Sequence, residues 1–113
     1  MTLDISRSAE SIRSDLYRIL DRFPGNFNID ELEARATDGR MQVFPARNST
    51  IIGCVCDNGC TAMLAAGAGN MSEIMDLEAY VCEYYFGGFG CEVMILHGRR
   101  GWWRYLRPHG WTP

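Results

Sequence analysis

The sequence lacks any segment that would carry the chain into or across a membrane. No apolar run approaches the roughly 20 residues of a membrane-spanning helix, and residues 1–7 carry acidic and hydroxyl groups in place of a basic stretch that leads into an apolar one. Internal repeats, linkers and low-complexity stretches are also missing. The 113 residues, 47% of them hydrophobic and 22% charged, therefore predict a single soluble intracellular domain over residues 1–113, with no membrane partner.

The cysteines do not form a set that could pair completely. There are five of them, an odd count without a secretory signal, so reduced thiols are expected. Zinc binding at Cys54, Cys56 and Cys60 is the alternative, because zinc takes about four soft ligands. The spacing of these three does not fit a usual zinc knuckle, and Cys54 and Cys56 stand two apart on an expected strand. We therefore expect no metal.

Charge is unevenly distributed along the chain. The net charge is −3, yet residues 99–113 hold four arginines and no acid, which leaves −7 on the remainder. Such asymmetry favours an interaction face. Aromatic residues interleave with the arginines, as phosphate contact and base stacking require, but the acidic chain as a whole disfavours nucleic acid as the partner. An acidic protein surface is the other alternative. The predicted face consists of Arg99, Arg100, Arg104 and Arg107.

The N-terminal part of the sequence predicts two helices. Apolar residues recur at helical spacing over residues 12–23, after Ser8 as a potential cap and before Pro24-Gly25 as a stop. A shorter helix is expected over residues 29–38, with Asn28 as its N-cap.

From Met41 the pattern changes to short apolar and β-branched runs, which predict strands over residues 41–45 and 49–56. Asn58-Gly59 accepts the positive φ angles of a two-residue type I′ turn. A further strand, antiparallel to the one before it, is therefore expected over residues 60–66.

A third helix is expected from Asn70 to about Phe86, followed by an apolar strand over residues 91–97 and a closing helix over residues 100–106. A crossover of this length predicts that the strands before and after the helix are parallel. The predicted fold class is thus α/β with a mixed sheet, formed by an antiparallel meander, a βαβ step and a closing helix. The apolar stripe of the third helix is expected to comprise Ile74, Leu77, Val81 and Tyr84.

The glycine-containing turn between the third strand and this helix is the most suggestive site for ligand binding. Glycines let the backbone approach a ligand closely, and the free N–H groups of a first helical turn favour phosphate or pyrophosphate. The alternative is a tight turn that needs glycine for its φ angles alone. The candidate cofactor-binding residues are Gly67, Ala68, Gly69 and Asn70.

The element order with a glycine turn at this point resembles the GNAT (GCN5-related N-acetyltransferase) superfamily, whose members hold acyl-coenzyme A with its pyrophosphate on that turn. The segment Gly98-Arg99-x-Gly101-Trp102-x-Arg104-x-Leu106-x-Pro108-x-Gly110-Trp111 is similar to the end of a small GNAT-like family of tailed bacteriophages and prophages. The resemblance covers residues 29–111. It implies a GNAT-like fold and acetyl-CoA, or another acyl-CoA, as the cofactor.

The chain departs from the family pattern at the positions that carry chemistry. Leu64 replaces a polar residue before the turn, the strand over residues 60–66 contains no acid to serve as base, and Leu106 stands where the family has a tyrosine that protonates the thiolate. The sequence also stops short of the family's last strands. His97 could act as a base near physiological pH, but a strand-end histidine is more often structural. No catalytic residue is therefore assigned.

Two functions follow from the resemblance and these departures. The first is a bacteriophage-encoded GNAT-fold protein that has lost acyl transfer and serves as a binding, structural or assembly component of a virion. The second is an active acyl-CoA-dependent N-acyltransferase, which holds pantetheine between splayed strands and relies on positioning. A protein partner, phage structural proteins among them, or a homo-oligomer is expected, in the host cytoplasm or the virion.

Overall fold

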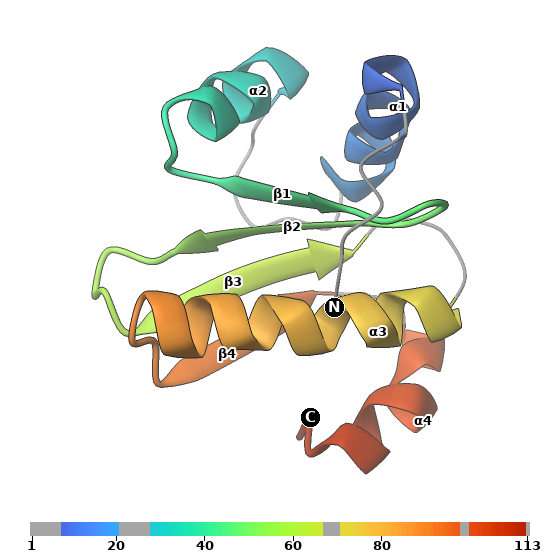
Figure 1. Ribbon diagram of the computed structural model, residues 1–113, viewed down its shortest axis with the longest axis vertical. Coiled ribbons are helices and arrows are strands. Elements are labelled where there is room, and N and C mark those ends of the chain that lie inside the picture. Colours follow the sequence, from blue (N-terminus) through green and yellow to red (C-terminus); the bar gives the residue numbers. More distant parts are fainter. Residues whose placement is uncertain (1–7, 21–27, 67–70, 98–99, 113) are drawn as a thin grey trace.

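A computed structural model of the protein describes residues 8–20, 28–66, 71–97 and 100–112, and Figure 1 shows its elements in the predicted order. The helices are α1 (Ala9–Leu20), α2 (Ile29–Thr37), α3 (Met71–Cys82) and α4 (Trp103–Leu106). The strands are β1 (Gln42–Pro45), β2 (Thr50–Val55), β3 (Thr61–Ala66) and β4 (Val93–His97). A π-helical turn, η1 (Glu83–Gly88), extends α3, and the 3-10 turns η2 (Arg100–Trp102) and η3 (Arg107–His109) flank α4.

The four strands form one mixed sheet in the order β1-β2-β3-β4. The first two pairs are antiparallel, as the predicted meander requires, and β3 pairs with β4 in parallel. The helix between β3 and β4 makes the crossover that a parallel pair needs. The predicted α/β class with a mixed sheet is confirmed in its strand order and strand directions.

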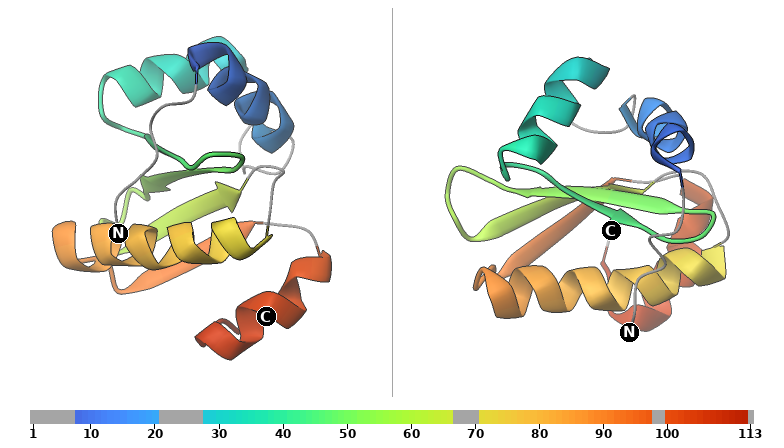
Figure 2. Two further views of the ribbon diagram at one scale, coloured as in Figure 1. Left: turned by 45° about the vertical axis from the view of Figure 1, so that its right-hand side comes forward. Right: turned by 45° about the horizontal axis from the view of Figure 1, so that its top comes forward.

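Helices cover both faces of the sheet, as the two views of Figure 2 show. α1 and α2 lie over one face and α3 over the other, while α4 lies beyond β4 (Figure 1). We call the first apolar cluster the α1/α2-side core; it consists of Leu16, Ile19, Ile29, Leu32, Met41, Ile52 and Ala65. The α3-side core consists of Phe44, Ile51, Ala62, Leu64, Ala66, Ile74, Leu77, Val81, Tyr85 and Cys91.

Both N-terminal helices begin at the predicted caps. The Ser8 hydroxyl accepts a hydrogen bond from the backbone N–H of Ser11 at 3.1 Å, and the Asn28 side chain accepts one from the N–H of Glu31 at 2.8 Å. Each cap satisfies a backbone donor that has no partner within the helix. The cap predictions are therefore confirmed.

The predicted two-residue type I′ turn between β2 and β3 is wrong. Gly59 has a positive φ of 74°, but no residue other than glycine has one among the described residues. The N–H of Gly59 instead bonds to the carbonyl of Cys56 at 2.9 Å, and the Asn58 side chain accepts hydrogen bonds from the N–H groups of Cys60 and Thr61 at 2.9 and 3.0 Å. An asparagine that bonds to the backbone ahead of it favours this longer turn.

The predicted apolar stripe of α3 needs one correction. Ile74, Leu77 and Val81 are buried, but the next fully buried side chain is Tyr85, and Tyr84 stays partly exposed. The π-helical turn explains the change, because its wider turn rotates each residue after Cys82 relative to an α-helix.

Tyr85 is buried because the sheet makes room for it at a glycine. A Cβ atom on Gly53 would lie 2.5 Å from the Tyr85 hydroxyl and 2.6 Å from Cδ2 of Leu64. The hydroxyl donates a hydrogen bond to Oε1 of Gln42 at 2.7 Å. A large aromatic ring thus packs directly on β2, with its polar end satisfied.

Candidate functional site

The predicted anion-binding turn, Gly67 to Asn70, lies outside the described residues. β3 ends at Ala66 and α3 begins at Met71, so the turn does join a strand of the parallel pair to the crossover helix. Its binding of a phosphate group stays a prediction.

The predicted arginine face is described only in part. Arg99 and the side chain of Arg100 lie outside the described residues, whereas Arg104 and Arg107 are exposed. The guanidinium of Arg104 lies 4.8 Å from the ring centroid of Tyr105 and donates to its hydroxyl at 3.1 Å. Arg104 therefore covers the neighbouring ring at the surface. Trp102 and Trp111 pack against the α3-side core, but each remains partly exposed.

β3 and β4 run side by side without the separation expected for a pantetheine site. Thr61 to Ala65 pair in unbroken register with Val93 to His97. In an acyltransferase of the expected type, the coenzyme arm would enter between these strands. Along this stretch the two backbones are hydrogen-bonded to each other, so no such opening exists there.

Tyr105, which is adjacent to Leu106, and His97 differ in their surroundings. Tyr105 is exposed and interacts with Arg104, so its hydroxyl does not point toward the sheet interior. The Nε2 atom of His97 is buried, and it has no hydrogen-bond partner among the described residues. The histidine ends β4 opposite Ala65.

The cysteines are free thiols that differ in how deeply they are buried. Cys60 is exposed, Cys54 and Cys56 are partly buried, and Cys91 is buried. Burial raises the pKa of the Cys91 thiol and also that of Cys54. Within the described ranges, no three His, Cys, Asp or Glu side chains are grouped as a metal ion would require.

A polar cluster on the inner side of α3, which the sequence analysis did not identify, centres on Glu78. This residue is only 8% exposed. Its Oε1 atom accepts hydrogen bonds from the indole Nε1 of Trp111 at 2.9 Å and from the thiol of Cys82 at 3.3 Å. Glu78 stands four residues after Ile74 and three before Val81, within the apolar stripe. An acid at that spacing was the available signal for a buried polar site.

The chain turn after η3 brings Trp111 to α3. Gly110 has a φ of 90°, in the left-handed region that side chains disfavour. Its N–H bonds to the carbonyl of Arg107 at 3.2 Å, which closes the turn. The chain then reverses, so that the Trp111 indole meets a residue 33 positions earlier in the sequence.

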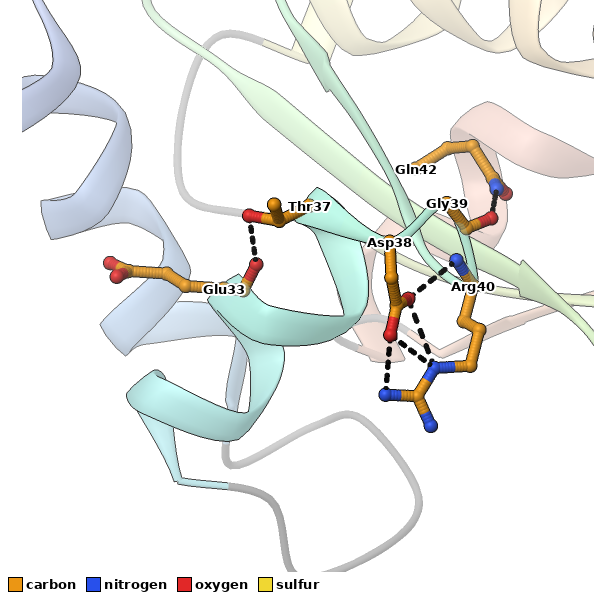
Figure 3. Close-up of polar contacts among 6 residues, drawn as sticks. All are labelled: Glu33, Thr37, Asp38, Gly39, Arg40 and Gln42. Carbon is orange, nitrogen blue, oxygen red and sulfur yellow. Dashed lines mark hydrogen bonds and ion pairs between the residues drawn. The ribbon is translucent and has the colours of Figure 1, made fainter.

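A second polar cluster fixes the turn from α2 to β1 (Figure 3). The Asp38 carboxylate accepts from Nε of Arg40 at 2.9 and 2.8 Å and lies 2.7 Å from its NH2 group. This side-chain hydrogen bond with Arg40 is the main reason that the pKa of Asp38 is lowered. Gly39, with a φ of 83°, lies between them. All these groups are exposed, so the cluster stabilises a surface turn.

The described residues form an α+β fold, in which a four-stranded mixed sheet has helices on both faces. The chain matches no model of a known protein family, no curated protein and no solved structure to which it was compared. In the described part of the chain, no helix has the length and apolar character needed to cross a membrane.

Proposed function

We propose that the protein is a bacteriophage-encoded, GNAT-like binding and assembly component that no longer transfers acyl groups, and that it associates with a second copy of itself through β4. The surface of β4 carries this proposal. Val93 and Ile95 are 51% and 40% exposed, although each is a large apolar side chain on a strand. Exposed apolar area on an ordered strand favours association with another protein.

The outer edge of β4 supports the proposal further. β4 pairs only with β3 within the described residues, so its outer backbone groups meet no strand there. The sequence Val93-Met-Ile-Leu-His97 contains no acid, arginine or proline. Strand edges that stay free normally carry such residues, because an unprotected edge pairs with other chains.

The opposite edge of the sheet shows this protection. β1 ends in Pro45, which lacks a backbone N–H group and therefore weakens pairing with a further strand. The difference between the two edges favours association through β4.

A second copy is the partner that fits this strand. β4 is short and apolar from Val93 to Leu96, so two β4 strands in antiparallel order would place similar side chains opposite each other across a two-fold axis. Their backbone groups would pair, and Val93 and Ile95 of both copies would cover one another.

The loss of acyl transfer is supported by β3 and by its pairing with β4. β3 contains no ionisable side chain, and its unbroken register with β4 leaves no opening over residues 61–65. A general base must reach the proton that it removes, and β3 offers none.

Light scattering during gel filtration tests the association. We expect a dimer that dissociates on dilution, and a monomer at the same concentrations for Ile95→Lys, because each lysine would place a charge against the apolar side chains of the other copy. Tyr17→Lys is the matched control, since Tyr17 is 53% exposed on α1; this variant should remain a dimer. A native chain that is monomeric at millimolar concentration, or an Ile95→Lys dimer, would contradict the proposal. A mass that reveals a different bound protein would also contradict the second copy as partner.

Calorimetric titration with acetyl-CoA and desulfo-CoA tests the loss of acyl transfer. The proposal expects no binding heat from either ligand. Micromolar binding that Gly67→Glu abolishes would instead favour the alternative, a working acyl-CoA-dependent N-acyltransferase with the coenzyme at residues 67–70.

A further inference from the structure

A cavity of about 250 Å³ lies between α3, β4 and the residues that follow α4. It is smaller than the roughly 300–1,000 Å³ of pockets that take drug-sized ligands, so only a small molecule or a single side chain would fit. The residues around it include Glu78, Cys82, Phe86, Met94, His109 and Trp111.

The Glu78 carboxylate supplies the polar part of this cavity. Both of its hydrogen-bond donors, the Trp111 indole and the Cys82 thiol, reach Oε1. The other oxygen, Oε2, receives no hydrogen bond from the described residues. None of the ion pairs that the structure describes includes Glu78. Glu78 is 8% exposed as a residue, so a cation that enters the cavity would meet its carboxylate in surroundings that hold little water, where an ion pair is stronger than at the open surface.

The two donors bring no positive charge into the cavity. Burial and the neighbouring Glu78 raise the pKa of the Cys82 thiol to about 12, so the thiol stays protonated at neutral pH and donates its hydrogen. The Trp111 indole is also a neutral donor. Together they hold one carboxylate oxygen in place.

Apolar and aromatic groups form a second part of the wall, beside His109, Gly110 and Thr112. Phe86 comes from η1, Met94 from β4 and Trp111 from the turn after η3. Aromatic rings attract cations through their π-systems, and they also accept the alkyl groups of an organic cation. A strongly hydrated metal ion would gain little here, because a single carboxylate is a poor ligand set.

We propose that this cavity binds a small organic cation, an alkylammonium or quaternary ammonium group, whose charge pairs with Glu78 and whose alkyl groups pack against Phe86, Met94 and Trp111. The site is separate from the surface proposed for self-association, because Met94 points to the α3 side of β4 whereas Val93 and Ile95 point to the other. It also differs from the predicted anion-binding turn at residues 67–70, since a negative carboxylate would repel phosphate.

Two ligands of the same shape and different charge test the proposal on the native chain. Choline carries a quaternary ammonium group, and 3,3-dimethylbutan-1-ol replaces its nitrogen by carbon. We expect choline to shift the indole N–H resonance of Trp111 saturably in a ¹H–¹⁵N spectrum, and the neutral alcohol to bind at least about tenfold more weakly. Trp111→Phe identifies the resonance. Equal affinity for both ligands, or no saturable shift with choline or butylammonium at tens of millimolar, would overturn the proposal.

A variant pair tests the role of the carboxylate. Glu78→Gln keeps a side-chain oxygen that can accept from Trp111 but removes the charge, so we expect choline binding to weaken at least about tenfold. Glu83→Gln is the matched control on an exposed position of η1 and should leave binding unchanged. Undiminished binding by a folded Glu78→Gln variant would refute the assignment. If Glu78→Gln does not fold, the comparison of the two ligands still decides.

Discussion

The two faces of the sheet are covered to different extents. On the α3 side the cover reaches the last strand, because Met94 and Leu96 of β4 pack against the α3-side core. On the other side α1 and α2 cover β1 to β3, and Val93 and Ile95 of β4 remain exposed. The same strand is thus partly buried on one face and open on the other.

The apolar side chains on the two faces of β4 therefore have different roles. The covered face holds the fold together, since its residues leave water when the chain folds. The open part of the other face adds little to the stability of a single copy, so its apolar side chains need a different explanation. Association with a second copy provides one.

The largest expected effect on stability separates a covered from an open position on the same face of the sheet, when isoleucine is replaced by threonine at each. Ile52→Thr, at a fully buried residue of the α1/α2-side core, should lower the free energy of unfolding by about 3 kcal/mol, because a cavity forms and a hydroxyl is buried. Ile95→Thr should cost less than about 0.5 kcal/mol. Urea unfolding of the monomer, at a protein concentration too low for association, measures both. Equal losses would remove the distinction between covered and open positions.

A smaller effect is expected at the contact between β2 and the α3-side core. Gly53→Ala places a methyl group against the Tyr85 ring and Leu64 and should destabilise the protein by about 2 kcal/mol. The control is Gly87→Ala, because nothing lies within 4 Å of the added Cβ atom and its φ is not positive. This change should be neutral or stabilise by up to about 1 kcal/mol. Thermal unfolding compares them, and a harmless Gly53→Ala would show that Tyr85 can move aside.

The smallest effect is expected at the exposed turn that leads from α2 to β1. Because the pKa of Asp38 is lowered from 3.8 in the folded state, its pairing with Arg40 stabilises the protein above that pH and is lost as the pH falls through the folded value. Asp38→Asn should therefore lower the melting temperature slightly at about pH 7 and leave it unchanged at about pH 2. Asp76→Asn, at an exposed residue of α3, is the control. A difference that persists in acid would exclude this ion pair as the cause.

Local signals in the sequence predicted much of the fold. Ser8 and Asn28 cap their helices through neighbours three residues away, and such short-range contacts can be identified without tertiary structure. The strand order and the parallel crossover also followed from pattern and chain direction. Tyr85 could not be predicted, because the π-helical turn and the space above Gly53 depend on residues far apart in the sequence.

The candidate sites also differ in whether they depend on neighbouring residues or on residues far apart in the sequence. Residues 67–70 formed a local motif, but they lie outside the described residues, and the arginine face is only partly described. The Glu78 cluster depends on an acid within an apolar stripe and on a tryptophan 33 residues later. The spacing of Glu78 was a usable signal, whereas its pairing with Trp111 needs the reversal at Gly110.

The long separation of Glu78 and Trp111 also orders events during protein synthesis. A ribosome that adds roughly 5–20 residues per second makes Glu78 about 2–7 s before Trp111, given the 33 positions between them. During that interval the carboxylate has no indole to bond to, and water must solvate it. The inner side of α3 therefore closes over Glu78 only after the turn at Gly110 has left the exit tunnel, so this cavity forms later than α3 itself.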